Sequence, residues 1–540
     1  MFQRSTSFSV LPLIPLGAIH ALSFAAGPVP SVLLPYLQLL SFAAFIFYML
    51  KAPSTRTALW GAWLFGTTQF SVGLYWFFIS MHEYGGLAAP LAGAAVFLFA
   101  ALMAIYYVLA VAVSRFFIRR SRDIGWKEQL AVAAVWASAW TLFEWVRGTF
   151  LTGFPWLSIA YGHVDGMFTG WAAVTGAYGL SWVVAYTACA LALFALNTSK
   201  AAPKSHNFPL GIAFALAVIG IVLHGITWSK PHGEPFFVRL AQGNIDQGIK
   251  FDSQYMNDGV ELYQKLAALP AKSADSQPSL IVLPETVVPL FQHQWQPQFW
   301  QQWIDIAAQQ NATLLLGAPL YAQKGEQAIY TNSAFTITAD SHPTAIQQLQ
   351  MQQRYDKHHL VPFGEFVPLG FRWFVDAMAI PLGDFNRGST RQANFAIGSE
   401  YIGPDICYED VFGEEIIQSV RDHPELGSGA TVLVNISNLG WFGDSWALRQ
   451  HLQIARLRSI ETARPMLRAT NTGMTASISP TGELQAVLPP HTVGVLDVEI
   501  QGMTGQTIYV LVGNGPVIIG SLVLLLMAFR LRSRAQRSKS

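Results

Sequence analysis

Long apolar stretches dominate the first 230 residues, and one more follows near the C-terminus. Each is long enough for an α-helix to cross a bilayer, which takes about 17 to 25 residues. The first stretch lacks a strongly basic start and leads into further spans, so we expect it to be retained and not cleaved as a signal peptide. Eight spans are predicted, at residues 8–26, 31–50, 57–80, 87–114, 128–147, 168–196, 209–228 and 509–529. The first two could instead form a short helical hairpin, because Pro12, Pro15 and the Gly27-Pro28 turn interrupt them.

The pattern changes between residues 230 and 508, where short apolar runs bounded by turn residues alternate with amphipathic stretches. Such alternation predicts a layered α/β domain with a mixed sheet and helices packed outside it. The expected strands are Phe236–Ala241, Leu280–Leu283, Thr313–Leu316, Ala334–Thr338, Thr431–Ile436 and Thr475–Ile478. The expected helices are 255–268, 297–310, 412–421 and 446–463.

Three parts follow from these patterns. Residues 1–229 form a helical membrane domain with seven spans, residues 230–508 form the α/β domain, and residues 509–540 form a last span with a basic tail. The composition agrees, because 52% of the 540 residues are hydrophobic and only 12% are charged, against about 25% in a soluble protein. The net charge of +1 and the absence of a basic stripe exclude nucleic acid as a partner.

Lys and Arg occur in alternate loops between the predicted spans and in the tail after Arg530, whereas the loops at 27–30 and 81–86 contain none. Cytoplasmic loops carry the excess of basic residues. With eight spans, both termini are therefore predicted to be cytoplasmic and residues 230–508 to lie on the outer face.

Glu144 and Arg147 are ionisable residues near the outer end of the fifth span. Charge at membrane depth often marks function, but residues three apart on a helix also form simple ion pairs. Two interpretations stay open: an interfacial ion pair, or a functional site in which the loop 148–162 lines a lipid entry path.

Cys407 follows a short apolar strand and lies between the carboxylates Asp405 and Glu409. The only other cysteine, Cys189, lies in an apolar helical run, so a disulfide is not expected. Cys407 is either a buried core thiol or a nucleophile.

Glu285 and Lys357 also lie where strands are expected to end or loops to begin. A carboxylate can take a thiol proton, and an ammonium can stabilise a thiolate and an oxyanion. Together with Cys407 they form a complete set for acyl transfer, in which the cation and the base are expected to lower the pKa of the thiol.

The sequence around these residues resembles the nitrilase superfamily. The motifs are Leu283-Pro284-Glu285, Ile406-Cys407-Tyr408-Glu409, Asn435-Ile436-Ser437-Asn438 before Trp441-Phe442-Gly443, and Lys357 followed by Leu360-Val361-Pro362-Phe363-Gly364-Glu365. Joined to eight spans, they narrow the resemblance to the apolipoprotein N-acyltransferase family of the bacterial inner membrane. It covers nearly the whole chain.

The resemblance implies an α-β-β-α sandwich in the periplasm and transfer of a fatty acyl chain from a phospholipid, through a thioester, to the N-terminal amine of a diacylglyceryl-modified apolipoprotein. No cofactor or metal is expected. By position, Glu285 is the base, Lys357 the oxyanion-stabilising cation and Cys407 the nucleophile. Supporting or substrate-positioning residues are Glu365, Tyr408 with its backbone N–H as an oxyanion donor, Glu409, Asn332 and Trp441.

Two positions depart from the family pattern. Phe251 follows Lys250 where the family often has Trp, and Leu439-Gly440 precedes Trp441 where Asp-Ala is common. Phe251 still offers an apolar face, whereas the second change is expected to alter a local hydrogen bond or the loop shape.

Two other functional classes remain open. A membrane-tethered amidase would use the same three residues with water as acceptor, and a lipid or lipoprotein carrier would use none of them. Eight spans are unnecessary for hydrolysis of a small amide, and a carrier does not require Glu, Lys and Cys together.

Aromatic residues crowd the segment 363–385, including Trp373. This segment is either core or a mobile interfacial lid that admits diacyl substrates. A second group, Trp295, Phe299, Trp300 and Trp303, is hypothesised to face the same membrane boundary.

Overall fold

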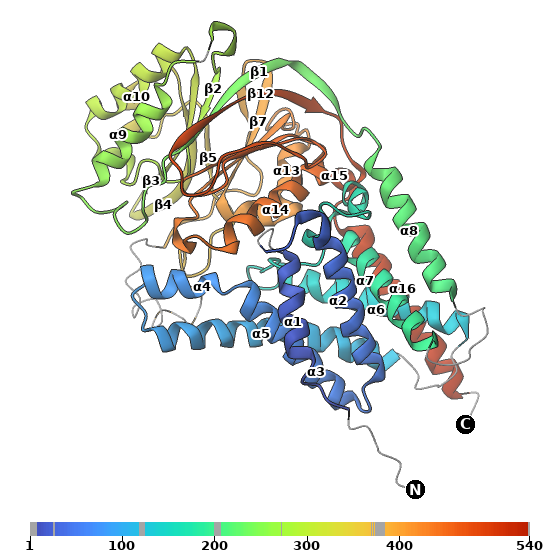
Figure 1. Ribbon diagram of the computed structural model, residues 1–540. Helices are drawn as coiled ribbons and strands as arrows, with labels where there is room; N and C mark the ends of the chain where they lie inside the picture. Colours follow the sequence, from blue (N-terminus) through green and yellow to red (C-terminus); the bar gives the residue numbers. More distant parts are fainter. Residues whose placement is uncertain are drawn as a thin grey trace. The chain divides into compact units, whose positions relative to one another are not determined.

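The computed structural model describes residues 8–24, 28–117, 125–198, 207–271, 273–368, 370, 372 and 384–537 (Figure 1). The chain divides into two compact units. The helical unit comprises Met1–Tyr75, Pro90–Ile226 and Val512–Ser540, and the α/β unit comprises Trp76–Ala89 and Thr227–Leu511. Of the hypothesised lid, residues 369, 371 and 373–383 lie outside the described residues, and Trp373 is among them.

The helical unit has a helix at each of the eight positions where a span is predicted. They are α1 (Leu13–Ala21) with η1 (Leu22–Phe24), η2 (Ser31–Leu33) with α2 (Leu34–Lys51), α3 (Thr55–Gly73), α5 (Ala89–Phe117), α6 (Trp126–Thr149), α7 (Ala172–Thr198), α8 (Phe208–His224) and α16 (Gly515–Arg537). Short 3-10 turns η4 (Tyr161–His163) and η5 (Thr169–Trp171) precede α7.

Among the described residues, four segments are both long and apolar enough to cross a membrane: Ser31–Lys51, Ala89–Phe117, Thr169–Asn197 and Gly515–Ser533. The count of eight spans stays a prediction.

The predicted end of the third span is wrong. The α3 helix stops at Gly73, because Leu74 leaves helical geometry with φ −119° and ψ 20°. The chain then forms the short helix α4 (Trp76–Ile79) and a π-helical turn, Ser80–Tyr84, and both belong to the α/β unit. There the Trp76 indole N–H donates to Gln450 Oε1 at 3.1 Å, and the Trp76 ring lies 4.5 Å from that of Phe442.

Glu144 and Arg147 are both buried, with 4.0 Å between a guanidinium nitrogen and a carboxylate oxygen. Arg147 donates to the carbonyl oxygens of Phe154 and Trp156, each at 2.6 Å. Glu144 accepts from the Ser158 hydroxyl at 2.8 Å and from the backbone N–H that follows it at 3.0 Å. These contacts favour the ion-pair interpretation, in which the pair holds the following loop.

The α/β unit contains two six-stranded mixed sheets, in the orders β12-β1-β2-β3-β4-β5 and β11-β10-β9-β8-β7-β6. The first comprises β1 (Lys230–Gln242), β2 (Leu280–Val282), β3 (Thr313–Lys324), β4 (Gln327–Ile337), β5 (Arg354–Asp356) and β12 (Gly494–Thr504). The second comprises β6 (Phe395–Ile397), β7 (Glu400–Ile406), β8 (Val432–Ser437), β9 (Met466–Thr470), β10 (Ala476–Ile478) and β11 (Leu484–Val487). All six predicted strands are confirmed, and mixed pairing is confirmed as well.

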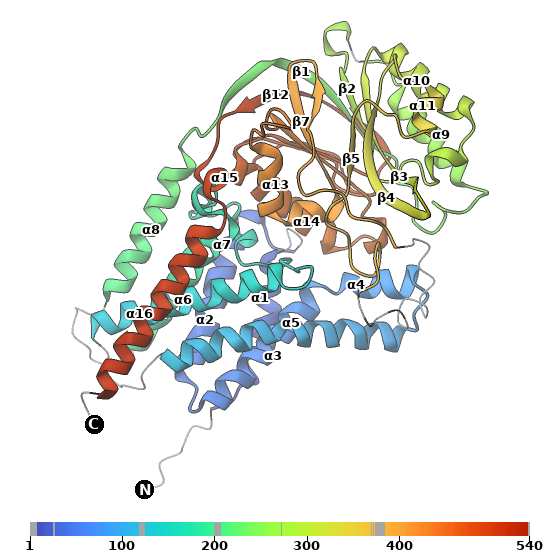
Figure 2. The same cartoon turned by 180° about the vertical axis from the view of Figure 1, so that it is seen from behind.

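Helices cover the outer faces of both sheets (Figures 1 and 2). The first sheet packs against α9 (Met256–Ala267), α10 (Pro297–Gln310) and α11 (Pro343–Gln347), and the second against α13 (Gly413–Val420) and α14 (Trp446–Thr462). The short helix α15 (Ile508–Val512) contributes to this second outer core. The four predicted helices are therefore present.

Side-chain alternation explains the layers, because successive residues of a strand point to opposite faces. Leu280 and Val282 pack between the sheets with residues such as Ile406, whereas Ile281 and Leu283 pack under the helices. The predicted α-β-β-α sandwich is confirmed.

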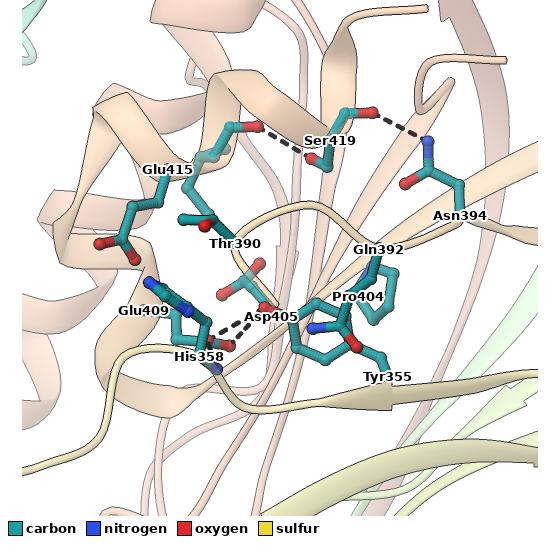
Figure 3. Close-up of a pocket in the computed structure, with 11 residues that line it drawn as sticks. Tyr355, His358, Thr390, Gln392, Asn394, Pro404, Asp405, Glu409, Glu415 and Ser419 are labelled. Atoms are coloured by element: carbon teal, nitrogen blue, oxygen red, sulfur yellow. Dashed lines mark hydrogen bonds between the residues drawn. The ribbon is translucent and has the colours of Figure 1, made fainter. Parts of the chain in front are cut away.

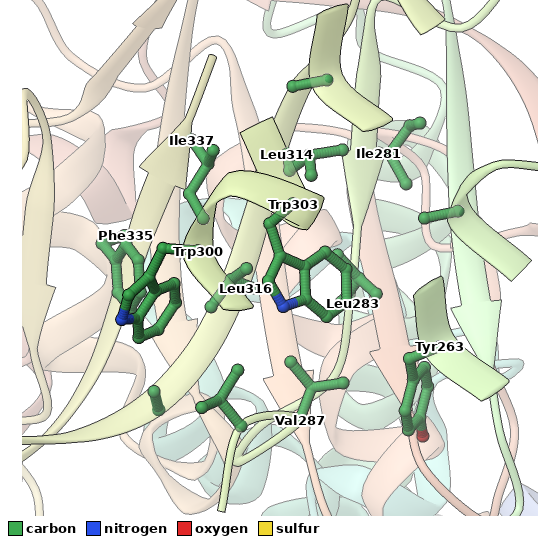
Figure 4. Packing of buried hydrophobic residues seen from close by; sticks show 14 of the residues in the cluster. Tyr263, Ile281, Leu283, Val287, Trp300, Trp303, Leu314, Leu316, Phe335 and Ile337 are labelled. Carbon is green, nitrogen blue, oxygen red and sulfur yellow. The ribbon is translucent and has the colours of Figure 1, made fainter. Parts of the chain in front are cut away.

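The hypothesis that the Trp295–Trp303 aromatics face a membrane boundary is wrong for its two central members. Trp300 and Trp303 are completely buried, and Figure 4 shows them packed with Phe335 and Leu316. Trp295 is partly buried against the same cluster. This aromatic face of α10 therefore forms the core between helix and sheet.

Candidate active site

The three predicted catalytic residues lie directly after strands of the two sheets. Glu285 follows β2, Lys357 follows β5, and Cys407 follows β7 as the first residue of a 3-10 turn, η9 (Cys407–Val411). Cys407 has a φ of +55°, and Thr286, next to Glu285, has +54°. Left-handed backbone at residues other than glycine is uncommon and is often found at functional sites.

Lys357 lies between two carboxylates. Its ammonium Nζ is 2.9 Å from Glu365 Oε1 and 3.3 Å from Glu285 Oε1. Burial alone would lower the pKa of Lys357, but the two carboxylates together outweigh it and raise that pKa. Lys357 is therefore a permanent cation.

Asn332, on β4, connects the same two carboxylates. Its amide nitrogen donates to Glu285 Oε1 and to Glu365 Oε1, each at 2.7 Å. Its backbone oxygen accepts from the Lys357 N–H at 2.8 Å. The second oxygen of Glu365 accepts from the Val361 N–H at 2.8 Å, which fixes this carboxylate.

Glu409 joins the nucleophile turn to the loop that carries Lys357. Its carboxylate accepts the backbone N–H groups of Ile406 at 2.7 Å, His358 at 2.6 Å and His359 at 3.1 Å. The Tyr355 hydroxyl donates to both of its oxygens at 3.0 Å. Burial raises the pKa of Glu409 to about 7, although these backbone donors and Lys357 act in the opposite direction.

A cavity of about 30 Å³ lies beside this carboxylate (Figure 3). It is lined by Glu409, Tyr355 and His358, but Glu285, Lys357 and Cys407 do not line it. The cavity therefore adjoins Glu409 and its hydrogen-bond partners, and it does not contain the three predicted catalytic residues.

The expectation of a lowered thiol pKa is wrong. Burial raises the pKa of Cys407 well above its ordinary value of 9, and Glu285 adds to this effect. Lys357 and the backbone N–H of Asn438 oppose it without overcoming it, because Lys357 is already paired with two carboxylates. The resting thiol is therefore protonated, and attack on a carbonyl requires a base.

Tyr408 and Trp441 differ in their surroundings. Tyr408 is buried, with its ring centroid 5.1 Å from that of Phe412 and in edge-on contact. Trp441 is half-buried, with its ring 6.0 Å from that of Tyr84. Phe251 is half-buried, and Leu439 is buried.

Two further residues of the site had no role assigned from the sequence. The backbone N–H of Asn438 donates to Glu285 Oε2 at 2.9 Å, and the ammonium of Lys250 donates to the Glu285 carbonyl oxygen at 3.2 Å. Burial lowers the pKa of Lys250 to about 8, against the opposing effect of Glu285 and Cys407. Both residues lie in quoted sequence motifs, which was the available signal.

The described residues include no group of three or more His, Cys, Asp or Glu side chains arranged to hold a metal ion. What the site does contain is a buried carboxylate, a fixed cation and a half-buried thiol on a buried turn between β7 and α13, a set of groups that can perform covalent acyl transfer.

Comparison with known proteins agrees with this chemistry. Residues 16–190 match the model of the apolipoprotein N-acyltransferase N-terminal domain, and residues 237–509 match that of the carbon-nitrogen hydrolase family. The chain is 45% identical over 527 residues to the apolipoprotein N-acyltransferase of Bordetella bronchiseptica, covering 96% of each chain. It is 40% identical over 522 residues to that of Ralstonia nicotianae, covering 96% of this chain and 93% of the relative.

Among solved structures, a CN-hydrolase superfamily protein of Xanthomonas campestris, XC1258, matches with a TM-score of 0.37 and 17% identity over 50% of this chain and 91% of that chain. The apolar helices and the full-length relatives identify a membrane protein. The chain belongs to the apolipoprotein N-acyltransferase family and is an acyltransferase with a carbon-nitrogen hydrolase domain.

Proposed function

We propose that the enzyme transfers a fatty acyl chain from a membrane phospholipid to the α-amine of the N-terminal diacylglyceryl-cysteine of an apolipoprotein, through a thioester on Cys407. The observation that carries this proposal is Lys357 held at 2.9 and 3.3 Å between two buried carboxylates, within electrostatic reach of the Cys407 thiol. A fixed cation beside a base and a nucleophile suits a reaction that passes twice through an oxyanion.

In the first half-reaction, Glu285 takes the thiol proton while the sulfur attacks the ester carbonyl carbon of the phospholipid. Lys357 and the backbone N–H of Tyr408 face the developing oxyanion. The carbon–oxygen bond then breaks, Glu285 returns the proton to the leaving alcohol, and a lysophospholipid departs. Asn332 and Glu365 hold Glu285 and Lys357 in place, and Glu409 holds the turn.

In the second half-reaction, the α-amine of the lipidated cysteine attacks the thioester. Glu285 takes the amine proton, the carbon–sulfur bond breaks, and the proton returns to the thiol. One site thereby serves a two-chain donor and a lipidated acceptor in turn, which covalent storage of the acyl group permits.

Mass spectrometry tests the intermediate directly. Incubated with phospholipid but without acceptor, the enzyme accumulates a fatty acyl adduct on the peptide containing Cys407, and neutral hydroxylamine releases it. Cys407→Ala carries no adduct and has no transferase activity, whereas Cys189→Ala, altered at a buried thiol of α7, retains both. An active Cys407→Ala enzyme, or an adduct on Cys189, would refute the mechanism.

The acceptor distinguishes this activity from amide hydrolysis by a membrane-tethered amidase. With the acyl-enzyme preformed, addition of a diacylglyceryl lipopeptide is expected to discharge the thioester much faster than water alone. Equal rates with and without the lipopeptide amine would favour hydrolysis.

We also infer that the protein lies in the bacterial inner membrane with several spans, with residues 230–508 in the periplasm and both termini in the cytoplasm. The alternation of basic loops supports this orientation. A reporter that works only in the periplasm is expected to be active when it is fused after residue 233 or residue 427. Activity of a cytoplasm-dependent reporter at either position would overturn the assignment.

A further inference from the structure

The carbonyl oxygen of Cys407 has two buried hydrogen-bond donors. Asn435 Nδ2, from β8, lies 3.1 Å away, and His451 Nε2, from α14, lies 3.2 Å away. Asn435 is itself held by Asp405 Oδ1 at 2.5 Å. The nucleophile is therefore fixed through its backbone by two side chains from different elements.

His451 is part of a compact buried cluster. Arg468, on β9, donates to His451 Nδ1 at 2.7 Å and to Asp410 Oδ2 at 2.6 Å. His451 Nε2 lies 2.7 Å from Asp410 Oδ1. All three side chains are at most 1% exposed.

The contacts determine the protonation of the imidazole. Because a guanidinium only donates, Nδ1 must accept and the proton must be on Nε2, which faces the Cys407 carbonyl and Asp410. Burial and the charge of Arg468 lower the pKa of His451 despite the opposing Asp410. His451 and Arg468 together outweigh burial and lower the pKa of Asp410. The cluster is thus a neutral histidine between a carboxylate and a guanidinium.

The peptide bond after Cys407 is planar and trans, so its C=O and its N–H point in opposite directions. The N–H belongs to Tyr408, the group assigned to the oxyanion in the proposed function. Holding the carbonyl of Cys407 therefore also sets the direction of the Tyr408 N–H. Since Cys407 has a left-handed backbone at φ +55°, this peptide requires support to keep its orientation.

We propose that His451, held by Asp410 and Arg468, is a positioning residue that orients the Cys407–Tyr408 peptide so that its N–H faces the oxyanion. This inference rests on the proposed function. It assigns a role to a buried histidine more than 40 residues away from the nucleophile in the sequence.

Two substitutions of His451 separate positioning from structural support. His451→Gln keeps an amide N–H long enough to reach the Cys407 carbonyl. His451→Asn keeps a polar partner for Arg468 but is too short to reach that carbonyl. His342→Leu, at an exposed position before α11, is the control.

Two reactions of Cys407 are measured in each variant. Acylation by phospholipid without acceptor forms an oxyanion, whereas alkylation by iodoacetamide displaces iodide at a saturated carbon and forms none. Losing one oxyanion donor slows a reaction by about 100-fold to 1000-fold. We expect His451→Asn to slow acylation by about 100-fold with unchanged alkylation, His451→Gln to restore most of the rate, and His342→Leu to match the wild type.

Parallel loss of acylation and alkylation in His451→Asn would overturn the proposal, because the residue would then merely maintain the fold of the turn. Unchanged acylation in His451→Asn would overturn it as well. Failure of the proposed function gives a different result, since the wild-type enzyme itself would then form no adduct on Cys407.

Discussion

Gly317 lies on β3 directly against the backbone of Glu285, the proposed catalytic base. A Cβ at this position would be 2.8 Å from the Glu285 Cα, 2.9 Å from the Thr286 nitrogen and 3.0 Å from the Ile436 Cδ1. Carbon atoms in contact prefer about 3.5 to 4.0 Å, so Gly317→Ala must displace the Glu285 backbone by roughly 0.5 to 1 Å. The backbone cannot relax easily, because Thr286 already has a φ of +54°.

Such a shift acts on the three hydrogen bonds of the Glu285 carboxylate. They measure 2.7 Å to Asn332, 2.9 Å to the Asn438 N–H and 3.3 Å to Lys357. Misplacement by about 1 Å costs on the order of 100-fold in rate, and overpacking costs about 1 to 3 kcal/mol of stability. We therefore expect Gly317→Ala to remain folded while the rate of Cys407 acylation falls by about 100-fold.

The assay is the single-turnover rate of acyl-enzyme formation with saturating phospholipid, together with a chemical unfolding curve in detergent. The matched control is Gly494→Ala on β12 of the same sheet, where a Cβ meets no atom of the described residues within 4 Å. A wild-type acylation rate in Gly317→Ala would refute the reasoning, and so would equal slowing in Gly494→Ala.

Three further substitutions test other parts of the domain. Glu365→Gln removes one of the two carboxylate partners of Lys357 and leaves Glu285 as the other, so it is expected to slow acylation and to lower stability by about 1 to 3 kcal/mol through the lost charged hydrogen bonds; an unchanged acylation rate would contradict a role in holding Lys357. Lys250→Met removes an ammonium whose pKa is lowered by burial from its ordinary value of 10.5 to about 8 in the folded protein. The unfolded chain therefore binds this proton more tightly than the folded protein, and the stability of the wild type decreases as the pH falls from 10.5 to 8. The Met variant is therefore expected to be more stable by about 3 kcal/mol at pH 7 and to lose this advantage near pH 10.5; a pH-independent difference in unfolding free energy would contradict this. Trp303→Ala is expected to destabilise the domain by about 3 to 5 kcal/mol and Trp295→Ala by clearly less, and equal losses in thermal unfolding would contradict their different burial.

The strands before Glu285 and Cys407 were predictable because each is a short apolar run, whereas the short strand β5 before Lys357 was not predicted. Leu280–Leu283 reads as a buried strand, and the first charged residue after it is Glu285. The same reading places Cys407 after an apolar strand. Position at a strand end did not identify these residues by itself; the motifs around Glu285, Lys357 and Cys407 and their resemblance to a known family did.

The supporting groups could not be predicted in this way. Asn438 acts on Glu285 through its backbone N–H, so the type of its side chain does not reveal this contact. His451 and Arg468 meet Asp410 only because helix α14, strand β9 and the turn η9 converge beside the nucleophile. Such contacts depend on tertiary geometry and not on local pattern.

The aromatic face of α10 shows a different ambiguity. Trp300 and Trp303 are three residues apart and form an apolar stripe, as an amphipathic helix requires. The stripe is compatible equally with a membrane surface and with a protein core. Only the position of the helix over β3 and β4, through Leu316 and Phe335, decides between them.

The raised pKa of Cys407 also changes how Lys357 must act. While Glu285 and Glu365 are both charged, they neutralise the field of Lys357, and the thiol stays protonated. In the proposed mechanism, Glu285 takes the thiol proton and loses its negative charge, and Lys357 is then left with a single carboxylate partner. Its field at the carbonyl oxygen then increases at the moment when negative charge develops there. The proton transfer that produces the nucleophile therefore also makes the positive charge of Lys357 available to the oxyanion, and reversal of that transfer withdraws it when the tetrahedral intermediate collapses.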